Sequence, residues 1–281
     1  MYNLRYHIAS LAAVFLALAL GLVLGGLVVQ QGSFSQQQRS IVAGLQRDFR
    51  RLTDQNADLR SDLSFERGYS GEMTDAWLTG RLGGRSVLVL TSGDKGEGAA
   101  AVISAIVDAG GNPVVITLVN REFGLNNSRV ESTIRSLVPS SANVPGDLAK
   151  ALALEWTTAD QPRPITDALV KVGAIQVAGL HASTVATEAV DIAAFSKKPD
   201  AVALDVVRAY ADAGLFAVGA QTPTSGTGVA SAAVQRKLSA FDTLGTPAGR
   251  FTLVTLFSGG EQGYFGRVQG VDKPFPAVPV P

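Results

Sequence analysis

Residues 85–119 have the sequence RSVLVLTSGDKGEGAAAVISAIVDAGGNPVVITLV, and this stretch decides the fold. Its two ends, Arg85–Thr91 and Pro113–Val119, are continuous apolar runs of the kind found in strands buried on both faces. Between them, Ala99–Ala109 has the composition of a helix and is followed by two glycines. This order predicts a βαβ unit with parallel strands and a right-handed crossover.

The alternation continues toward the C-terminus. We expect further helices at residues 127–137, 146–156, 164–173, 200–214 and 227–238, and further strands at 174–178, 216–221 and 249–257. Strands that alternate with helices predict a doubly wound, mostly parallel α/β sheet of flavodoxin-like or Rossmann-like type. We assign this soluble domain to residues 85–270 and a proline-rich, irregular tail to residues 271–281.

Near the N-terminus, a flank of residues 1–7 precedes an apolar segment, Ile8–Val29, that contains no charged residue. As a helix the segment is about 33 Å long, enough to cross a hydrocarbon core of about 30 Å. A cleaved signal peptide is the alternative, but its apolar region is shorter, at about 7–15 residues. We therefore expect an uncleaved transmembrane helix at residues 8–29, held in a lipid bilayer.

Small residues recur at every fourth position of this segment: Ala9, Ala13, Ala17, Gly21 and Gly25. In a helix they form one ridge, along which a second helix can approach closely. The alternative is that alanine and glycine are simply common in such segments.

The charges on the two sides of the segment indicate its orientation. Arg5 lies just before it, whereas the first cation after it is Arg39. The positive-inside rule favours a cytoplasmic N-terminus, with the soluble domain outside.

Residues 30–67 have the pattern of a coiled-coil stalk. Position a of the heptad holds Val42, Phe49, Asn56 and Leu63, and position d holds Leu45, Leu52 and Leu59. Leucine at every d position with one asparagine at a is typical of a parallel dimer with a fixed register. An amphipathic helix packed on its own domain is the alternative. A connection at residues 68–84, with a short amphipathic piece around Trp77, leads to the α/β domain.

Composition excludes several classes of function. The 24 basic and 24 acidic residues give zero net charge, so we expect no nucleic-acid partner. The chain contains no cysteine, which excludes disulfides, thiolate metal sites and a cysteine nucleophile.

Two glycine-rich loops precede helices and are candidate anion sites, because backbone N–H groups at a helix N-terminus can bind an anion. In the first, Gly93, Gly96 and Gly98 are spaced G-x-x-G-x-G rather than G-x-G-x-x-G, and Asp94 and Glu97 would repel an anion. We therefore interpret this loop as a turn.

The second loop, Thr222–Gly228, carries hydroxyl groups that could meet an anion. N-capping of the next helix by Thr227 or Ser225 is the preferred interpretation.

Residues for catalysis or metal binding are scarce. The only histidines are His7 and His181, and the only methionines are Met1 and Met73, too few for a closed copper site. No G-x-S-x-G elbow or paired acid and base is present. The sequence predicts no catalytic, cofactor-binding or metal-binding residue, and we expect that the protein is not an enzyme.

Both ends of the chain nevertheless resemble a known family, the mycobacterial copper transport protein B family. The similar segments are His7–Gly26 (HIASLAAVFLALALGLVLGG), Arg51–Leu63 (RLTDQNADLRSDL), Phe241–Phe257 (FDTLGTPAGRFTLVTLF) and Gly263–Gly266 (GYFG). The resemblance implies a membrane-anchored envelope protein with a role in copper efflux or homeostasis. It brings no catalytic or metal-ligand residues to this sequence.

Two hypotheses follow. The first, implied by the resemblance, is copper transport or homeostasis, with copper as cargo. The second is a non-catalytic envelope scaffold or regulator, whose coiled coil and α/β domain bind a protein partner in cell-wall remodelling or division. Both include a homodimer or higher homo-oligomer.

Overall fold

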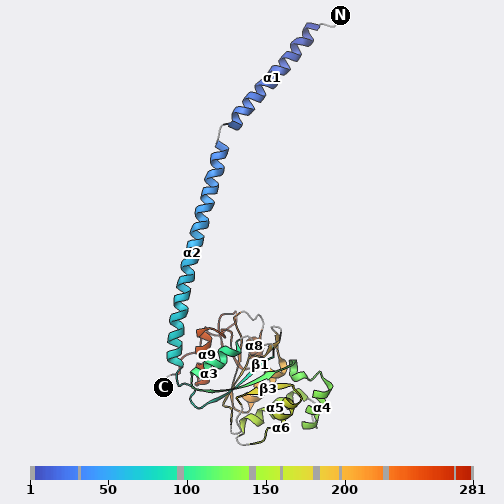
Figure 1. Cartoon of the computed structure of the whole chain (residues 1–281), viewed down its shortest axis with the longest axis vertical. Coiled ribbons are helices and arrows are strands. Elements are labelled where there is room, and N and C mark those ends of the chain that lie inside the picture. The colour runs from blue at the N-terminus through green and yellow to red at the C-terminus, as the bar shows by residue number, and fades with distance from the viewer. Residues whose placement is uncertain are drawn as a thin grey trace. The chain divides into compact units, whose positions relative to one another are not determined.

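The computed structural model describes residues 4–30, 33–93, 98–138, 144–158, 161–179, 184–195, 198–223, 228–268 and 270–279 (Figure 1). The chain divides into two compact units, Met1–Glu66 and Arg67–Pro281. Two long helices come first, α1 (Leu4–Gln30) and α2 (Ser33–Leu78).

The second unit contains a main sheet and a small two-stranded sheet formed by β5 and β6. The strands of the unit are β1 (Ser86–Ser92), β2 (Asn112–Leu118), β3 (Ile175–Ala178), β4 (Glu188–Asp191), β5 (Ala194–Phe195), β6 (Lys198–Pro199), β7 (Phe216–Ala220), β8 (Ser239–Phe241) and β9 (Tyr264–Phe265). Its helices are α3 (Ala99–Asp108), the 3-10 helix η1 (Arg121–Gly124), α4 (Ser128–Leu137), α5 (Val144–Thr157), α6 (Pro164–Lys171), α7 (Ala201–Asp212), α8 (Val229–Gln235) and α9 (Pro247–Phe257).

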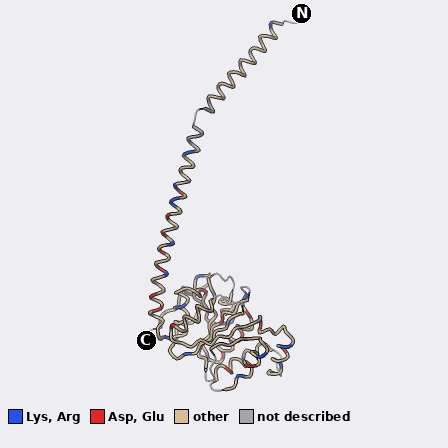
Figure 2. Tube along the Cα trace, in the orientation of Figure 1, with Lys and Arg blue, Asp and Glu red and all other residues tan. Residues whose placement is uncertain are grey.

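Helix α1 confirms the predicted N-terminal apolar helix. Its segment Arg5–Leu27 is long and apolar enough to cross a membrane by length and composition. Figure 2 shows no charged residue along α1 beyond its first turn, because Arg5 alone carries a full charge there. Among the described residues, no other helix meets the same criteria.

Helix α2 extends further than the heptad pattern. Residues 68–78, which the sequence assigns to a connection, continue the helix without interruption. Leu78 at its end and Leu82 just beyond it are fully buried. The last turns of α2 therefore belong to the hydrophobic core of the second unit.

The seven strands of the main sheet have the order β3-β2-β1-β4-β7-β8-β9. Every neighbouring pair is parallel except β2 and β3, which are antiparallel. From β1, the chain adds β2 and then β3 on one side of the sheet. It then returns to the other side of β1 and adds β4, β7, β8 and β9 in that order. The predicted doubly wound, mostly parallel sheet is confirmed, and its topological switch point lies between β1 and β4.

Helices cover both faces of the sheet, as the alternation along β1 shows. Val87 and Val89 pack into a core with the end of α2, α3 and α9, whereas Leu88 and Leu90 pack into a core with α4 to α8. In Figure 1, α3 and α9 accordingly lie on one side of β1, and α5 and α6 on the other.

One predicted strand is wrong. Residues 249–257 form most of helix α9, which begins after the N-cap Thr246, whose side chain accepts a hydrogen bond from Gly249 N at 3.1 Å. Pro247 occupies the first turn, where its missing N–H costs nothing. Because Thr252 to Phe257 are all buried, the sequence lacks the polar face that would have marked a helix.

Candidate functional site

In open α/β sheets, ligands usually bind outside the carboxyl ends of the strands at the switch point. Here β4 ends at Asp191, which is fully buried. Its Oδ1 accepts a hydrogen bond from Ala193 N at 2.8 Å, and its Oδ2 has no partner among the described residues. Burial raises the pKa of this carboxyl well above 3.8, and the nearby charge of Asp200 adds to the effect. The edge thus holds a buried acid that favours its neutral form.

The chain itself occupies the neighbouring part of this edge. Asp200 is also fully buried; its Oδ1 accepts from Ala203 N at 3.0 Å, which caps α7, and its Oδ2 accepts from Glu122 N at 2.6 Å. The second bond holds Glu122 and Phe123 in consecutive left-handed conformations, with φ of 53° and 55°. Both oxygens of Asp200 therefore serve the fold.

Of the two glycine-rich loops, the structure describes Gly98 close to Thr222. Gly98 has φ of 102°, and a Cβ added to it would overlap Leu244 and lie 3.6 Å from Cγ2 of Thr222. Glycine is thus required here by backbone conformation and by packing, which supports the interpretation of a turn. Residues 94–97 and 224–227, including Asp94, Gly96, Glu97, Ser225 and Thr227, lie outside the described residues.

The predicted caps of α8, Thr227 and Ser225, lie outside the described residues. Gly228 occupies its N-cap position, and the helix begins at Val229. A side-chain acceptor comes from Gln221, at the end of β7, whose Oε1 accepts from Ala230 N at 3.1 Å. Local sequence could not show this bond, because it links residues brought together by the sheet.

No copper site is formed in the described part of the chain. His7 is exposed in α1, and Met73 is 56% exposed on α2. His181 and Met1 lie outside the described residues, which contain no cluster of three His, Cys, Asp or Glu side chains suited to a metal. The side chains described do not fit a bound copper ion, since copper favours several imidazole or sulfur ligands together.

A buried acid and base that the sequence did not single out lie between α5 and α6. Glu155 accepts hydrogen bonds from Ile165 N at 2.6 Å and from both the backbone N (3.0 Å) and Oγ1 (2.8 Å) of Thr166. Arg163 lies 4.1 Å from the ring centroid of Trp156 and donates to the carbonyl of Thr184. These contacts cap α6 and hold the loop before β4, so the pair has a structural role.

The heptad residues of α2 form an exposed surface. We call Val42, Leu45, Phe49, Leu52, Asn56, Leu59 and Leu63 the heptad face. Its apolar side chains are between 49% (Leu63) and 74% (Phe49) exposed. On α1, the glycines Gly21, Gly25 and Gly26 line a shallow groove, with open space where each Cβ would be. Among the described residues, both surfaces are exposed.

The C-terminal end of α2 is fastened to the α/β domain. Arg250 of α9 pairs with Asp75 of α2 at 2.5 Å and with Asp108 of α3 at 2.6 Å. Beside these ion pairs, the Trp77 and Phe251 rings lie 4.7 Å apart between centroids. Residues 67–78 of α2 are therefore held against α3 and α9 within the second unit.

Comparison with known proteins places these features in a family. A family model described as "Copper transport outer membrane protein, MctB" matches residues 1–276. The Copper transporter MctB of Mycobacterium tuberculosis is 37% identical over 146 residues, 50% of this chain and 44% of that protein. The protein of the same name from Mycobacterium leprae is 32% identical over 145 residues, with the same coverage.

The match thus spans less than half the length of these curated relatives. No solved structure matches the chain. Because the family model covers almost the whole sequence, the chain belongs to the MctB family of copper transport proteins.

Proposed function

We propose that this protein is a single-pass envelope protein that limits copper accumulation in the cell, and that it does so without catalysis. The observation that carries the proposal is the match of residues 1–276 to a family described by copper transport. The apolar helix α1 and the family description both support association with a membrane or envelope.

The protein acts as an assembly rather than as a single-chain carrier. One candidate membrane helix per described chain is too little to enclose a path for an ion, and the described residues form no copper site. We propose that two copies pair through the heptad face, with the small residues of α1 allowing close approach. Copper efflux would then depend on the oligomer and on further envelope proteins.

The proposed orientation puts the N-terminus in the cytoplasm and the α/β domain outside. Arg5 before the apolar segment supports it. Since the chain has no cysteine, Asn3→Cys and Ser132→Cys each introduce one unique thiol. A membrane-impermeant maleimide should label Ser132→Cys in intact cells and Asn3→Cys only after lysis. The reverse pattern would invert the orientation.

A second candidate function is a scaffold that presents the α/β domain to a partner in cell-wall remodelling or division. The exposed heptad face favours it, because exposed apolar side chains at heptad spacing suit a protein that binds a second helix. Copper handling would then be an indirect consequence of envelope assembly.

The deciding experiment measures total cell copper by mass spectrometry in a strain that lacks the gene and grows under copper load. Copper above the wild-type level, restored by the full-length gene, supports the first function. Unchanged copper together with impaired cell separation supports the scaffold and rejects the copper role.

A further inference from the structure

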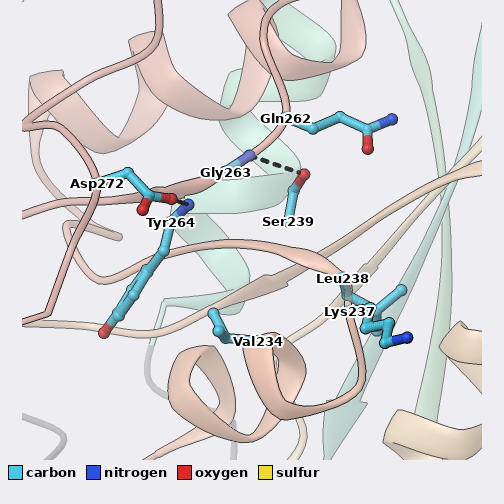
Figure 3. Close-up of a pocket in the computed structure, with 8 residues that line it drawn as sticks. All are labelled: Val234, Lys237, Leu238, Ser239, Gln262, Gly263, Tyr264 and Asp272. Atoms are coloured by element: carbon cyan, nitrogen blue, oxygen red, sulfur yellow. Dashed lines mark hydrogen bonds between the residues drawn. The ribbon is translucent and has the colours of Figure 1, made fainter.

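A cavity of about 250 Å³ opens at the amino ends of β8 and β9, the sheet edge opposite the switch point. Its walls come from the end of α8, the turn before β8, the loop before β9 and the segment after it (Figure 3). The lining residues that matter are Val234, Lys237, Leu238, Ser239, Gln262 and Asp272. None of them belongs to the copper proposal, so the inference below goes beyond it.

The backbone places Lys237 at this cavity in a strained conformation. Its φ is 58°, in the left-handed region, at the position just after α8 where glycine is usual. Lys237 N donates to Val234 O at 2.9 Å, and Leu238 N donates to Ala233 O at 3.1 Å, which completes the helix-ending turn. The turn sets the point at which the Lys237 side chain leaves the backbone, among the residues that line the cavity.

Two opposite charges line the cavity without neutralising each other. Lys237 and Asp272 form no ion pair within 4.0 Å, with one another or with any other described group. Figure 3 shows them on opposite sides of the cavity. The next cation along the chain, Lys273, is already paired with Glu261 at 2.7 Å. The rim of the cavity therefore carries one cation and one anion, both exposed to solvent and without an ion-pair partner among the described residues.

The charged and polar side chains that line the cavity can form further hydrogen bonds. Asp272 uses Oδ2 to accept from Tyr264 N at 2.8 Å, and its Oδ1 has no partner among the described residues. Ser239 Oγ accepts from Gly263 N at 3.3 Å, so its hydroxyl hydrogen is free to donate (Figure 3). These groups can complete the binding of a ligand that carries both an acid and an amine.

The size and the apolar wall restrict the ligand. Val234 is 40% exposed and Leu238 is buried, and both line the cavity, so part of its wall is aliphatic. A cavity of 250 Å³ has the volume of about eight water molecules, which suits a ligand of about ten non-hydrogen atoms.

We propose that this cavity binds a small aliphatic zwitterion, a free amino acid or a dipeptide. The ligand's carboxylate pairs with Lys237, its ammonium pairs with Asp272, and its side chain lies against Val234 and Leu238. The protein would thereby sense or hold an amino-acid-like molecule at the amino ends of β8 and β9, opposite the switch point.

The test is calorimetric titration of the full-length chain in detergent with L-leucine, alanyl-alanine, L-leucinamide and N-acetyl-L-leucine. We expect a dissociation constant of about 1 mM for the better zwitterion. Removing either ligand charge should weaken binding about tenfold. Tighter binding of leucine assigns the free amino acid, and tighter binding of alanyl-alanine assigns the dipeptide. No binding, or equal binding of the blocked compounds, overturns the proposal.

Variants connect each ligand charge to its protein partner. Lys237→Gln should abolish the preference for leucine over leucinamide, and Asp272→Asn the preference for leucine over acetyl-leucine. Asp272→Asn keeps an oxygen for Tyr264 N, and Lys237→Gly provides a second uncharged variant that the left-handed backbone accommodates.

Lys273→Gln is the control and should leave affinity within twofold, since Lys273 does not line the cavity. Retained preferences in both cavity variants would contradict the assignment.

Discussion

Arg250 of α9 binds Asp75 of α2 through Nη1, at 2.5 Å from Oδ1. Its second terminal nitrogen binds Asp108 of α3 at 2.6 Å, so one guanidinium joins three helices. The Arg250 side chain is 21% exposed, whereas Asp75 and Asp108 are 57% and 46% exposed, so the guanidinium is the shielded partner in both pairs.

Replacing Arg250 by methionine should lower the free energy of unfolding by about 1–2 kcal/mol, because a charge-assisted hydrogen bond to Asp108 and an ion pair to Asp75 are lost while both carboxylates remain partly solvated. Urea unfolding of the full chain in detergent measures the change. The control is Arg135→Met, whose pair with Glu131 is exposed and should contribute at most about 0.5 kcal/mol. Equal effects of the two substitutions would show that Arg250 stabilises the contact with α2 no more than an exposed ion pair does.

Asp191→Asn should make stability less dependent on pH. Burial raises the pKa of Asp191 above 3.8, so its contribution to stability is full below that pH and is lost as the pH rises through the raised value. The variant keeps an acceptor for Ala193 N but cannot ionise. Its advantage over the parent should grow with pH, by up to about 1.4 kcal/mol per unit inside that window.

Unfolding free energies at several values between pH 4 and 9 test this. The exposed Asp147→Asn serves as control and should follow the parent. Parallel curves for Asp191→Asn and the parent would show that the buried carboxyl does not take up a proton on folding.

Gly266→Ala should destabilise the domain by about 2 kcal/mol or more. Gly266 has φ of 141°, and a Cβ there would overlap the carboxylate of Asp242. That carboxylate accepts from Arg267 N at 2.9 Å and from Val268 N at 3.0 Å, so moving it would also break these bonds. Gly214→Ala, with φ of 94° but open space, separates backbone strain from overlap. Thermal unfolding should rank Gly266→Ala as clearly the more harmful change.

Cross-linking tests the paired stalk. In this cysteine-free chain, Leu52→Cys puts one thiol at heptad position d, and Arg51→Cys puts one at the outer position c. A mild oxidant should give a disulfide-linked dimer of Leu52→Cys in membranes, seen on a non-reducing gel, and little dimer of Arg51→Cys. Similar yields from both positions would argue for chance collision rather than a seam.

Asn56→Leu tests the heptad register. A single polar residue at position a lowers stability but selects one oligomeric state. The leucine variant should therefore melt at a higher temperature and distribute over more than one oligomer in sedimentation experiments. An unchanged distribution would count against Asn56 at position a.

Much of the fold was open to prediction where an element is long and apolar. Strands β1 and β2 and helix α3 agree with the predicted positions to within one residue at each end, because turns with glycine or proline bound them. Strand β4 was missed because its sequence EAVD begins and ends with acids. Glu188 is tolerated in the sheet through its 2.8 Å pair with Arg85, a contact that spans more than a hundred residues and leaves no local pattern.

The zwitterion cavity was equally hidden. Lys237 and Asp272 are 35 positions apart and share no motif; the parallel pairing of β8 with β9 alone brings their segments together. The copper resemblance, by contrast, came from the two ends of the chain, whose described residues are similar to the family but gather no group of side chains suited to hold the metal.

The burial of Leu78 and Leu82 in the core of the second unit limits how this protein can be recombined with its relatives. A chimera that takes its α/β domain from residue 85 onward would combine Val87 and Val89 with foreign helix-end residues, and would have to refill that core. A crossover before Arg67, at the boundary between the two compact units, takes the last turns of α2 and the sheet that they cover from the same parent. Heptads can thus be inserted or exchanged upstream of that residue, while the last turns of α2 must be inherited together with the sheet they cover.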